Sequence, residues 1–298
     1  MLNYSICIVT YKTHDRLRDC LNSIFCNQVK ASFEIIVVDN ASNDGTLEML
    51  AANYPTVRVI TNANNLGYTK PMNQALRVAS GEFLIQLNPD TILNPGGLDA
   101  IYQYLQANPH VGICAPKVVN GDGSMQWQCR RSEARPWDVI AYFTHLSQLF
   151  PGSSRFAGYL MTYKSPDEIY EVQAVSGSCM IIRRGVIDAI GYLDEEFFAY
   201  QEDTDFCFRA RRAGWKVIYL PLTQVIHFGA EGGTRVHPYR SAIEWHRSYF
   251  LYFRKWLAKD YFFLLNLLFY GLMALKFGFA LIKIFFSRDK YPSTRKPA

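Results

Sequence analysis

The chain has 298 residues, a length that suits one large α/β domain or two small ones. Hydrophobic residues make up 49% of it and charged residues 19%, which is typical of a globular protein with some tendency toward membrane contact. The formal net charge of +5 is too small to indicate a nucleic-acid-binding protein, and no basic block with interleaved aromatic residues is dense enough to form such a surface. We therefore expect no nucleic-acid partner.

The seven cysteines are scattered, odd in number and free of any C-x-x-C pair. This distribution argues against a zinc site and against a disulfide framework, and it favours a reducing compartment. The first residues, MLNYSICIVTY, carry no basic region followed by a long apolar stretch, so they do not predict a signal peptide. They predict a first β-strand.

The N-terminal third alternates short apolar runs with stretches of helical periodicity. Strands are predicted at residues 4–10, 33–38, 57–60 and 82–87, and helices at 14–26, 46–53 and 70–79. The run FEIIVV at 33–38 is apolar without alternation, as in a parallel strand that is covered on both faces. The repeated strand–helix order predicts an α/β fold with a doubly wound, mostly parallel sheet.

Polar side chains follow three of these strands at the point where each strand ends. They are Thr10, Tyr11, Asp39, Asn40, Asn88 and Asp90. Ligands of open α/β sheets bind beyond the C-terminal ends of the strands, so these side chains predict a binding site. For the segment NPDT, ordinary turn chemistry is the alternative to a ligand role. The sequence contains no dinucleotide-binding glycine motif, P-loop or nucleophile elbow.

The chain after Asp90 has a looser pattern. A helix is predicted at 95–107, strands at 112–119 and 172–182, a hairpin turn at 120–123, and a helix starting at 183–185. Residues 135–164 are rich in aromatic and basic side chains. This segment is either an irregular insertion or a surface that faces an acceptor or a membrane, and both interpretations stay open.

Three carboxylates, Glu202, Asp203 and Asp205, stand at the start of a helix predicted to run to Arg212. Their attraction to the helix dipole would explain such a cluster without any function. The aromatic residues at 197, 198 and 200 favour the alternative, because an apolar wall raises the pKa of a carboxyl group and suits a general base. Because successive residues of an α-helix are rotated by about 100° about its axis, at most two of the three carboxylates can face a substrate.

His227 ends a strand predicted at 223–227 and is followed by a glycine-rich loop. A single histidine is often a hydrogen-bonded structural residue. Its place at another strand end makes a ligand role the competing interpretation.

Residues 261–286 are almost entirely apolar and long enough to span a bilayer. Lys276 near the centre and Lys283 seven residues later make a span unfavourable, and both flanks are basic. We expect residues 255–290 to bind a membrane surface as a helix or helical hairpin that lies in the interface. A span and a buried helix of a homodimer are the alternatives.

Seven segments occur in an order that resembles a known family. They are IVTYK (8–12), VVDNASNDGT (37–46), NNLGYTKPMNQAL (64–76), FLIQLNPDT (83–91), VSGSCMIIRR (175–184), GYLDEEFFAYQEDTDFCFRARRAGWKVIYLP (191–221) and VIHFG (225–229). Together they resemble the inverting GT-A glycosyltransferases of family 2, especially the bacterial rhamnosyltransferase-like branch. The resemblance covers residues 4 to about 235.

The resemblance implies roles for the predicted site residues. Asp90 and His227 would hold a divalent metal, Mg²⁺ or Mn²⁺, and Asn88 would contact the ribose or, weakly, the metal. Thr10, Tyr11, Asp39 and Asn40 would form the nucleoside pocket. Lys70 and Arg235 would contact the diphosphate, although Pro71 departs from the usual glycine. Asp203 would be the general base, with Glu202 beside it in the catalytic centre.

The implied reaction is a single in-line displacement with inversion at the anomeric carbon. The donor would be dTDP-rhamnose or a UDP-sugar, and the acceptor a lipid-linked or glycan molecule of bacterial surface polysaccharide synthesis. The cytoplasmic face of the cell membrane would be the location. Residues 1–237 would form the GT-A domain, with a nucleotide half at 1–118 and an acceptor half at 119–237, and residues 238–298 the membrane-associating region.

Two other functions remain open. One is a membrane-bound subunit that binds a nucleotide-sugar without catalysis, which the neutral Asn88 suggests. The other is a sugar nucleotidyltransferase, but that class carries a glycine-rich basic loop after its first strand, where this chain has TYKTH.

Overall fold

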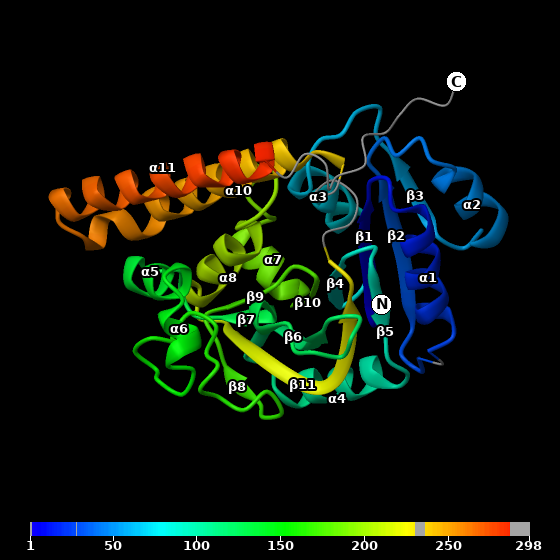
Figure 1. Cartoon of the computed structure of the whole chain (residues 1–298). Coiled ribbons are helices and arrows are strands. Elements are labelled where there is room, and N and C mark those ends of the chain that lie inside the picture. Colours follow the sequence, from blue (N-terminus) through cyan, green and yellow to red (C-terminus); the bar gives the residue numbers. More distant parts are fainter. Residues whose placement is uncertain (1, 28, 230–235, 287–298) are drawn as a thin grey trace, which may run out of the picture.

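The structure is a computed structural model that describes residues 2–27, 29–229 and 236–286. Within these ranges, a central mixed sheet has the strand order β3-β2-β1-β4-β10-β6-β11-β5, with β8 paired to β11, and helices cover it (Figure 1). The first four strands are β1 (Tyr4–Thr10), β2 (Phe33–Asp39), β3 (Arg58–Thr61) and β4 (Phe83–Leu87). β1 is parallel to both β2 and β4, and β2 is parallel to β3. The predicted parallel arrangement of this half is confirmed.

The helices between these strands are α1 (His14–Phe25), α2 (Thr46–Asn53) and α3 (Thr69–Val78). Successive side chains of a strand point to opposite faces of a sheet. Ile6 therefore packs with Leu17 and Leu21 of α1, whereas Cys7 packs with Met72 of α3. Burial on both faces is why this strand is apolar at nearly every position. Each large side chain buried in this way stabilises the fold by about 1.5–3 kcal/mol.

The second half of the sheet is where the prediction for residues 172–182 is wrong. Two separate strands occur there, β9 (Ala174–Val175) and β10 (Cys179–Arg183), and β8 (Tyr170–Glu171) ends just before the predicted range. β8 pairs with β11 (Lys216–His227), β9 with β7 (Arg130–Arg131), and β10 with β4 and β6 (Val111–Val119). Because β9 and β10 have different partners, no straight strand can serve both.

The register of the strands brings two distant segments together. β11 runs parallel to β6 and antiparallel to the short β5 (Thr91–Leu93), with His227 opposite Thr91. The backbone N–H of Phe228 donates to the carbonyl of Asp90 at 3.0 Å. Asp90 and His227 therefore lie side by side at the edge where β1, β2 and β4 also end.

The remaining helices follow β5 along the chain. They are α4 (Gly97–Ala107), α5 (Pro136–Phe143), α6 (Leu146–Leu149), α7 (Arg184–Ile190), α8 (Glu202–Arg212), α10 (Pro238–Tyr252) and α11 (Phe263–Phe286). α8 has the limits that the sequence predicts. The segment 135–164 contains the helices α5 and α6 and is not wholly irregular.

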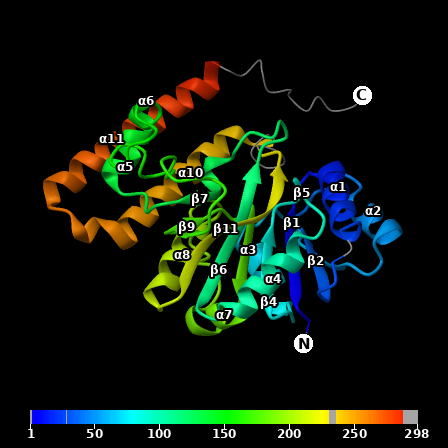
Figure 2. The same cartoon turned by 90° about the horizontal axis from the view of Figure 1, so that it is seen from below.

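α10 and α11 form an antiparallel helical hairpin that projects beyond the sheet (Figures 1 and 2). A wider turn of π-helix, Phe253–Leu257, ends α10. There Lys255 Nζ and Trp256 Nε1 donate to Asp205 Oδ1 at 2.9 and 2.7 Å, which ties the hairpin to α8. In the described part of the chain, α11 is the one helix long and apolar enough to cross a bilayer, and Phe269 is its one buried residue.

Candidate active site

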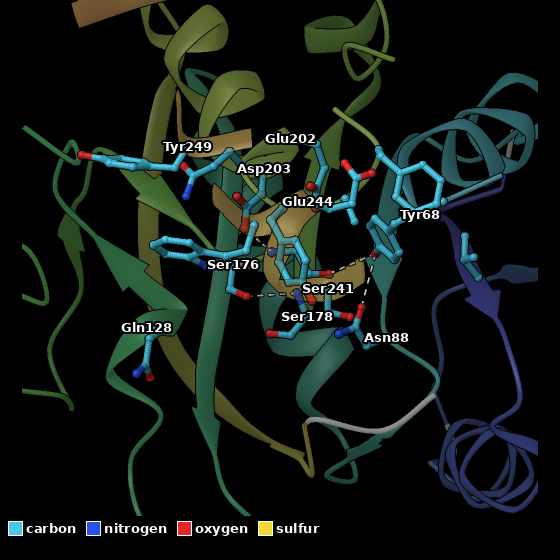
Figure 3. A pocket seen from close by; sticks show the side chains of 18 of the residues that line it. Tyr68, Asn88, Gln128, Ser176, Ser178, Glu202, Asp203, Ser241, Glu244 and Tyr249 are labelled. Carbon is cyan, nitrogen blue, oxygen red and sulfur yellow. Dashed lines mark hydrogen bonds between the residues drawn. The ribbon is translucent and has the colours of Figure 1, made fainter. Parts of the chain in front are cut away.

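A cavity of about 500 Å³ opens at the edge of the sheet where β1, β2, β4 and β11 end. α8, α5 and α10 form its other walls. Figure 3 shows Glu202 and Asp203 between Tyr249 on one side and Tyr68 and Asn88 on the other. The cavity therefore joins the strand-end residues to an acidic pair and then to an aromatic wall.

Asp90, His227 and Asn88 line one end of the cavity. The Oδ1 atom of Asp90 lies 3.3 Å from Nε2 of His227, and Asn88 Nδ2 donates to the same nitrogen at 3.1 Å. Asp90 Oδ2 accepts the backbone N–H of Gly229 at 2.9 Å. Two polar side chains from the turn after β4 and one from the end of β11 thus meet at one point.

Gln126 determines which nitrogen of His227 is free to bind a ligand. Its Oε1 lies 2.9 Å from Nδ1 of His227, and since an amide oxygen only accepts, Nδ1 carries the proton. Gln126 is itself held by hydrogen bonds from its Nε2 to the carbonyl of His227 and to Asn120. The neutral ring then presents an Nε2 lone pair toward Asp90, the tautomer that ligates metals.

Two acceptor atoms, His227 Nε2 and Asp90 Oδ1, at 3.3 Å repel each other unless a proton or a cation lies beside them. A carboxylate and an imidazole are ligands that Mn²⁺ and Mg²⁺ accept, and diphosphate oxygens and water can complete an octahedral shell. No cluster of three or more histidine, cysteine or acidic ligands occurs in the described residues. The pair therefore fits a metal that is shared with a bound phosphate group.

Asp39 and Thr10 lie behind the cavity surface at the ends of β2 and β1. Asp39 is buried, its Oδ2 accepts the N–H of Ser42 at 3.3 Å, and its Oδ1 has no hydrogen-bond partner in the described residues. The hydroxyl groups of Thr10 and Thr13 form a hydrogen bond with an Oγ1–Oγ1 distance of 2.8 Å. A buried, unsatisfied carboxylate oxygen costs free energy, so Asp39 is suited to accept a ligand N–H.

Tyr11 and Asn40 line the cavity. The Tyr11 hydroxyl lies 3.1 Å from Nε2 of His237, and the two rings stack. Asn40 Nδ2 donates to the carbonyl of Gly67 at 2.7 Å, and its Oδ1 accepts from Leu66 and Asn62. The side-chain hydrogen bonds of Asn40 hold the 62–67 loop, and they thereby shape the pocket.

Gly67 allows this loop to approach the start of α8. Its φ of +90° favours glycine, and a Cβ atom there would lie 2.4 Å from the carbonyl oxygen of Phe198.

The structure does not place at the cavity the two residues that the resemblance connects to the diphosphate. Lys70 is exposed and does not line the cavity, and Arg235 lies outside the described residues.

Asp203 accepts four hydrogen bonds. Its Oδ2 accepts from Arg131 Nη2 at 2.8 Å and from the N–H of Gly177 at 3.0 Å. Its Oδ1 accepts the N–H and the hydroxyl of Thr204. The ion pair with Arg131 holds the carboxylate in one orientation.

Glu202 has the opposite environment. It is buried, and its Oε2 has no partner in the described residues. Burial, and next the neighbouring Asp203 charge, raises the pKa of Glu202 to about 8. Two adjacent acidic side chains with different environments thus line the cavity, the arrangement expected of acid–base chemistry.

The backbone before α8 is strained. Tyr200 and Gln201 have φ of 67° and 62°, a region that costs a non-glycine residue about 1–3 kcal/mol. This turn directs Glu202 and Asp203 into the cavity, while Asp205 points away to Lys255, Trp256 and Arg209. The expectation that at most two of the three acids face the cavity is confirmed.

Several cavity residues were missed by the sequence analysis. Arg131 carries no motif, and Trp245 and Tyr249 belong to α10, which was expected to be part of the membrane region. Gln126, which orients His227 without lining the cavity itself, carries no motif either. Tyr142 and Phe143 of α5 are also on the cavity wall. The aromatic richness of 135–164 was the one available signal.

A family model and two similar curated proteins all indicate a glycosyltransferase. The family model described as glycosyl transferase family 2 matches residues 5–191. The N-acetylglucosaminyl-diphospho-decaprenol L-rhamnosyltransferase of Mycobacterium tuberculosis is 29% identical over 240 residues, which is 76% of each chain. A low-salt glycan biosynthesis hexosyltransferase of Haloferax volcanii is 26% identical over 227 residues, 75% of this chain and 66% of its own.

Solved structures have the same fold at lower identity. A mannosyltransferase from Pyrobaculum calidifontis, in complex with GDP-Man and Mn²⁺, matches with a TM-score of 0.57 and 18% identity over 85% of this chain. The S. aureus protein TarS in complex with UDP matches with a TM-score of 0.53 and 20% identity over 83%. This chain spans 64% and 65% of those two chains. The GT-A fold is confirmed, and the chain belongs to glycosyltransferase family 2.

Proposed function

We propose that the protein is an inverting glycosyltransferase that moves a sugar from a nucleoside diphosphate donor to a lipid-linked or glycan acceptor in bacterial surface polysaccharide synthesis. The observation that carries this proposal is the single cavity that joins the Asp90–His227 pair to the acidic pair and the aromatic wall. The similarity to a rhamnosyltransferase supports dTDP-rhamnose as the donor, and the UDP complex of TarS supports a UDP-sugar as the alternative.

The donor would lie along the strand ends. Asp39 Oδ1, which lacks a partner in the described residues, would accept the imide N–H of a pyrimidine base, and Tyr11 would lie beside the nucleoside. Asn88 would contact the ribose or the metal, and Asp90 and His227 would hold the cation against the diphosphate. A divalent cation, when bound, neutralises charge on the leaving diphosphate.

The acceptor would enter from the side of α5 and α10. Asp203, held in one orientation by Arg131, would take the proton of the attacking hydroxyl as the oxygen forms its bond to the anomeric carbon. The bond to the diphosphate breaks on the opposite face, so the configuration inverts. Glu202, protonated below about pH 8, would donate a hydrogen bond to another acceptor oxygen.

The helical hairpin would place this site at the cytoplasmic face of the membrane. The exposed side chains of α11 are mostly leucine and phenylalanine, and a surface of that kind is stable when it enters the headgroup region of a bilayer. The decaprenol acceptor in the name of the mycobacterial relative supports a membrane-bound substrate. Residues 287–290 of the expected membrane segment lie outside the described residues, as do the cations that follow them.

The test is transfer of a radiolabelled sugar by the purified chain, with dTDP-rhamnose and UDP-sugars offered in turn, with and without Mn²⁺. We expect transfer with one donor, loss of transfer in D203N, and retained nucleotide binding by that variant. D188N, an exposed acid on α7, is the control. Nucleotide binding without transfer by the wild type would favour the inactive binding subunit, and no nucleotide binding would refute the proposal.

A further inference from the structure

Lys276 lies in the middle of the apolar helix α11, and its ammonium group is surrounded by aromatic rings. Nζ lies 3.8 Å from the ring centroid of Trp245 on α10 and 4.1 Å from that of Phe143 on α5. Both distances are well inside the range of a cation–π interaction. Side chains of α5 and α10 thus converge on one lysine of α11.

The other close neighbour of Lys276 is His246, and it is neutral. Its Nδ1 lies 2.7 Å from the carbonyl of Ala242, so Nδ1 carries the proton, and Nε2 is left to accept from Lys276 Nζ at 3.3 Å. Burial, the larger effect, and the nearby Lys276 charge lower the pKa of His246 against the raising effect of the Ala242 carbonyl. In the described part of the chain, no carboxylate forms an ion pair with Lys276.

The ammonium is therefore a partly desolvated charge without a counter-ion among the described residues. Burial is the cause that lowers the pKa of Lys276, to about 8. A cation in this state gains more from an incoming anion than an exposed lysine does, because less water has to be removed from it. The aromatic rings stabilise the charge but cannot neutralise it.

Lys276 also has a defined position relative to the cavity. Phe143 and Trp245, the two rings against its ammonium, line the same cavity as Glu202 and Asp203. Beyond the lysine, the face of α11 exposes large apolar side chains, which include Leu272, Leu275 and Phe279. The order from the catalytic centre outward is acidic pair, aromatic wall, cation and apolar helix surface.

We propose that Lys276 binds a phosphate of a lipid-diphosphate acceptor, with the acceptor sugar in the cavity and the lipid chain along α11. An acceptor of the form sugar–diphosphate–lipid has the same order of groups as the surface just described. The inference rests on the proposed function for its sugar and adds the residue that recognises the phosphate. An ammonium is a suitable phosphate ligand because it donates up to three hydrogen bonds as a point charge.

A phosphate on Lys276 has a second source, the headgroup of an anionic phospholipid. Lys283 distinguishes the two, since it lies seven residues further along the same face of α11 and is exposed. Lys283 has the position to meet headgroups but does not contact the cavity wall. K283M is therefore the matched control for K276M, and K276R tests whether charge alone is sufficient.

The first experiment compares two acceptors with the full chain in mixed micelles. One is an N-acetylglucosaminyl-diphospho-lipid, and the other is an alkyl N-acetylglucosaminide with the same chain and no diphosphate. We expect K276M to raise the acceptor KM about 10- to 100-fold for the diphospho-lipid, the scale of one charge-assisted hydrogen bond, and to leave the alkyl glycoside unchanged. K283M should change neither, and K276R should recover part of the loss. An equal loss with both acceptors would overturn the proposal.

The second experiment separates the phosphate site from the proposed reaction. Geranyl diphosphate is added to the protein, and its binding is followed by tryptophan fluorescence. UDP or dTDP is present at saturation, so that the donor end of the cavity is filled. Weaker binding by K276M than by wild type and K283M supports the site even if no transfer is found. Equal binding by all three refutes it even if transfer occurs. Sedimentation with phosphatidylglycerol vesicles should be unaffected by K276M, and a selective loss there would assign the lysine to headgroups.

Discussion

Nη2 of Arg131 lies 2.8 Å from Oδ2 of Asp203, and the two side chains are only 12% and 11% exposed. They come from β7 and α8, 72 positions apart in the sequence. The guanidinium also donates to the hydroxyl of Thr204 and the carbonyl of Val175. Arg131 is thus a positioning residue for the proposed base, because it holds the direction of the carboxylate.

Replacement of Arg131 by lysine should lower kcat about 10- to 100-fold with little change in nucleotide affinity. Lysine keeps the charge but lacks the rigid planar guanidinium that places Nη2 beside the carboxylate, so the carboxylate loses its orientation. Initial rates at saturating donor and a nucleotide titration would measure the two effects. R77K is the control, since Arg77 pairs with Glu195 at the exposed surface. A change in nucleotide affinity equal to the loss in kcat would contradict the assigned role.

The buried Glu202 should make stability depend on pH. In the unfolded chain its pKa is near 4.5, and in the folded chain it is about 8, so between these values the folded state holds the extra proton. The free energy of unfolding therefore falls as pH rises through this window, by a few kcal/mol at most.

Glutamine at position 202 removes that titration. We expect the Tm of E202Q to exceed that of the wild type, by a margin that grows from about pH 5 to about pH 8. E48Q, an exposed glutamate on α2, should show no such trend. A constant difference between E202Q and wild type across the range would mean that Glu202 is ionised throughout.

Gln126 should control metal affinity although it would not touch the metal. Gln126→Leu removes the acceptor that keeps the proton on Nδ1 of His227, and loss of such an orienting partner typically weakens metal binding about 10- to 100-fold. Titration of Mn²⁺ into the nucleotide complex, followed by thermal shift, would measure this. Q148L, an exposed glutamine on α6, is the control. Unchanged Mn²⁺ affinity in Q126L would remove His227 from the ligand set.

Gly67→Ala should destabilise the fold by at least about 2 kcal/mol. The left-handed φ alone costs an alanine about 1–2 kcal/mol, and its Cβ would meet the Phe198 carbonyl at 2.4 Å. G152A has no neighbouring atom within 4 Å of the new Cβ and should have almost no effect. Urea denaturation of both variants tests this, and equal midpoints would show that the loop moves without cost.

Two leucines on the exposed face of α11 should contribute to membrane binding. Leu268 and Leu275 are 61% and 62% exposed, and burial of a leucine is worth about 1.5–3 kcal/mol. Replacement of both by glutamine should weaken sedimentation with vesicles at least about 10-fold and leave Tm unchanged. The same change at the exposed Leu149 and Leu222 is the control. Equal sedimentation of both double variants would argue against the hairpin as the membrane contact.

The amino-acid sequence by itself determined the local elements and the family. β1, α2 and α8 have their predicted limits, because apolar periodicity, helix-start acids and terminating glycines act over a few neighbouring residues. The ordered motifs identified glycosyltransferase family 2, and the strand-end position of Asn88, Asp90 and His227 follows from the parallel topology alone.

The tertiary structure alone decided which of these residues act together. It divided the predicted strand at 172–182 into β9 and β10, turned Asp205 away from the cavity, and placed Lys70 outside it. It also brought Arg131 to Asp203. Each of these outcomes depends on contacts between residues far apart in the chain, and such contacts leave no periodicity that a local pattern can reveal.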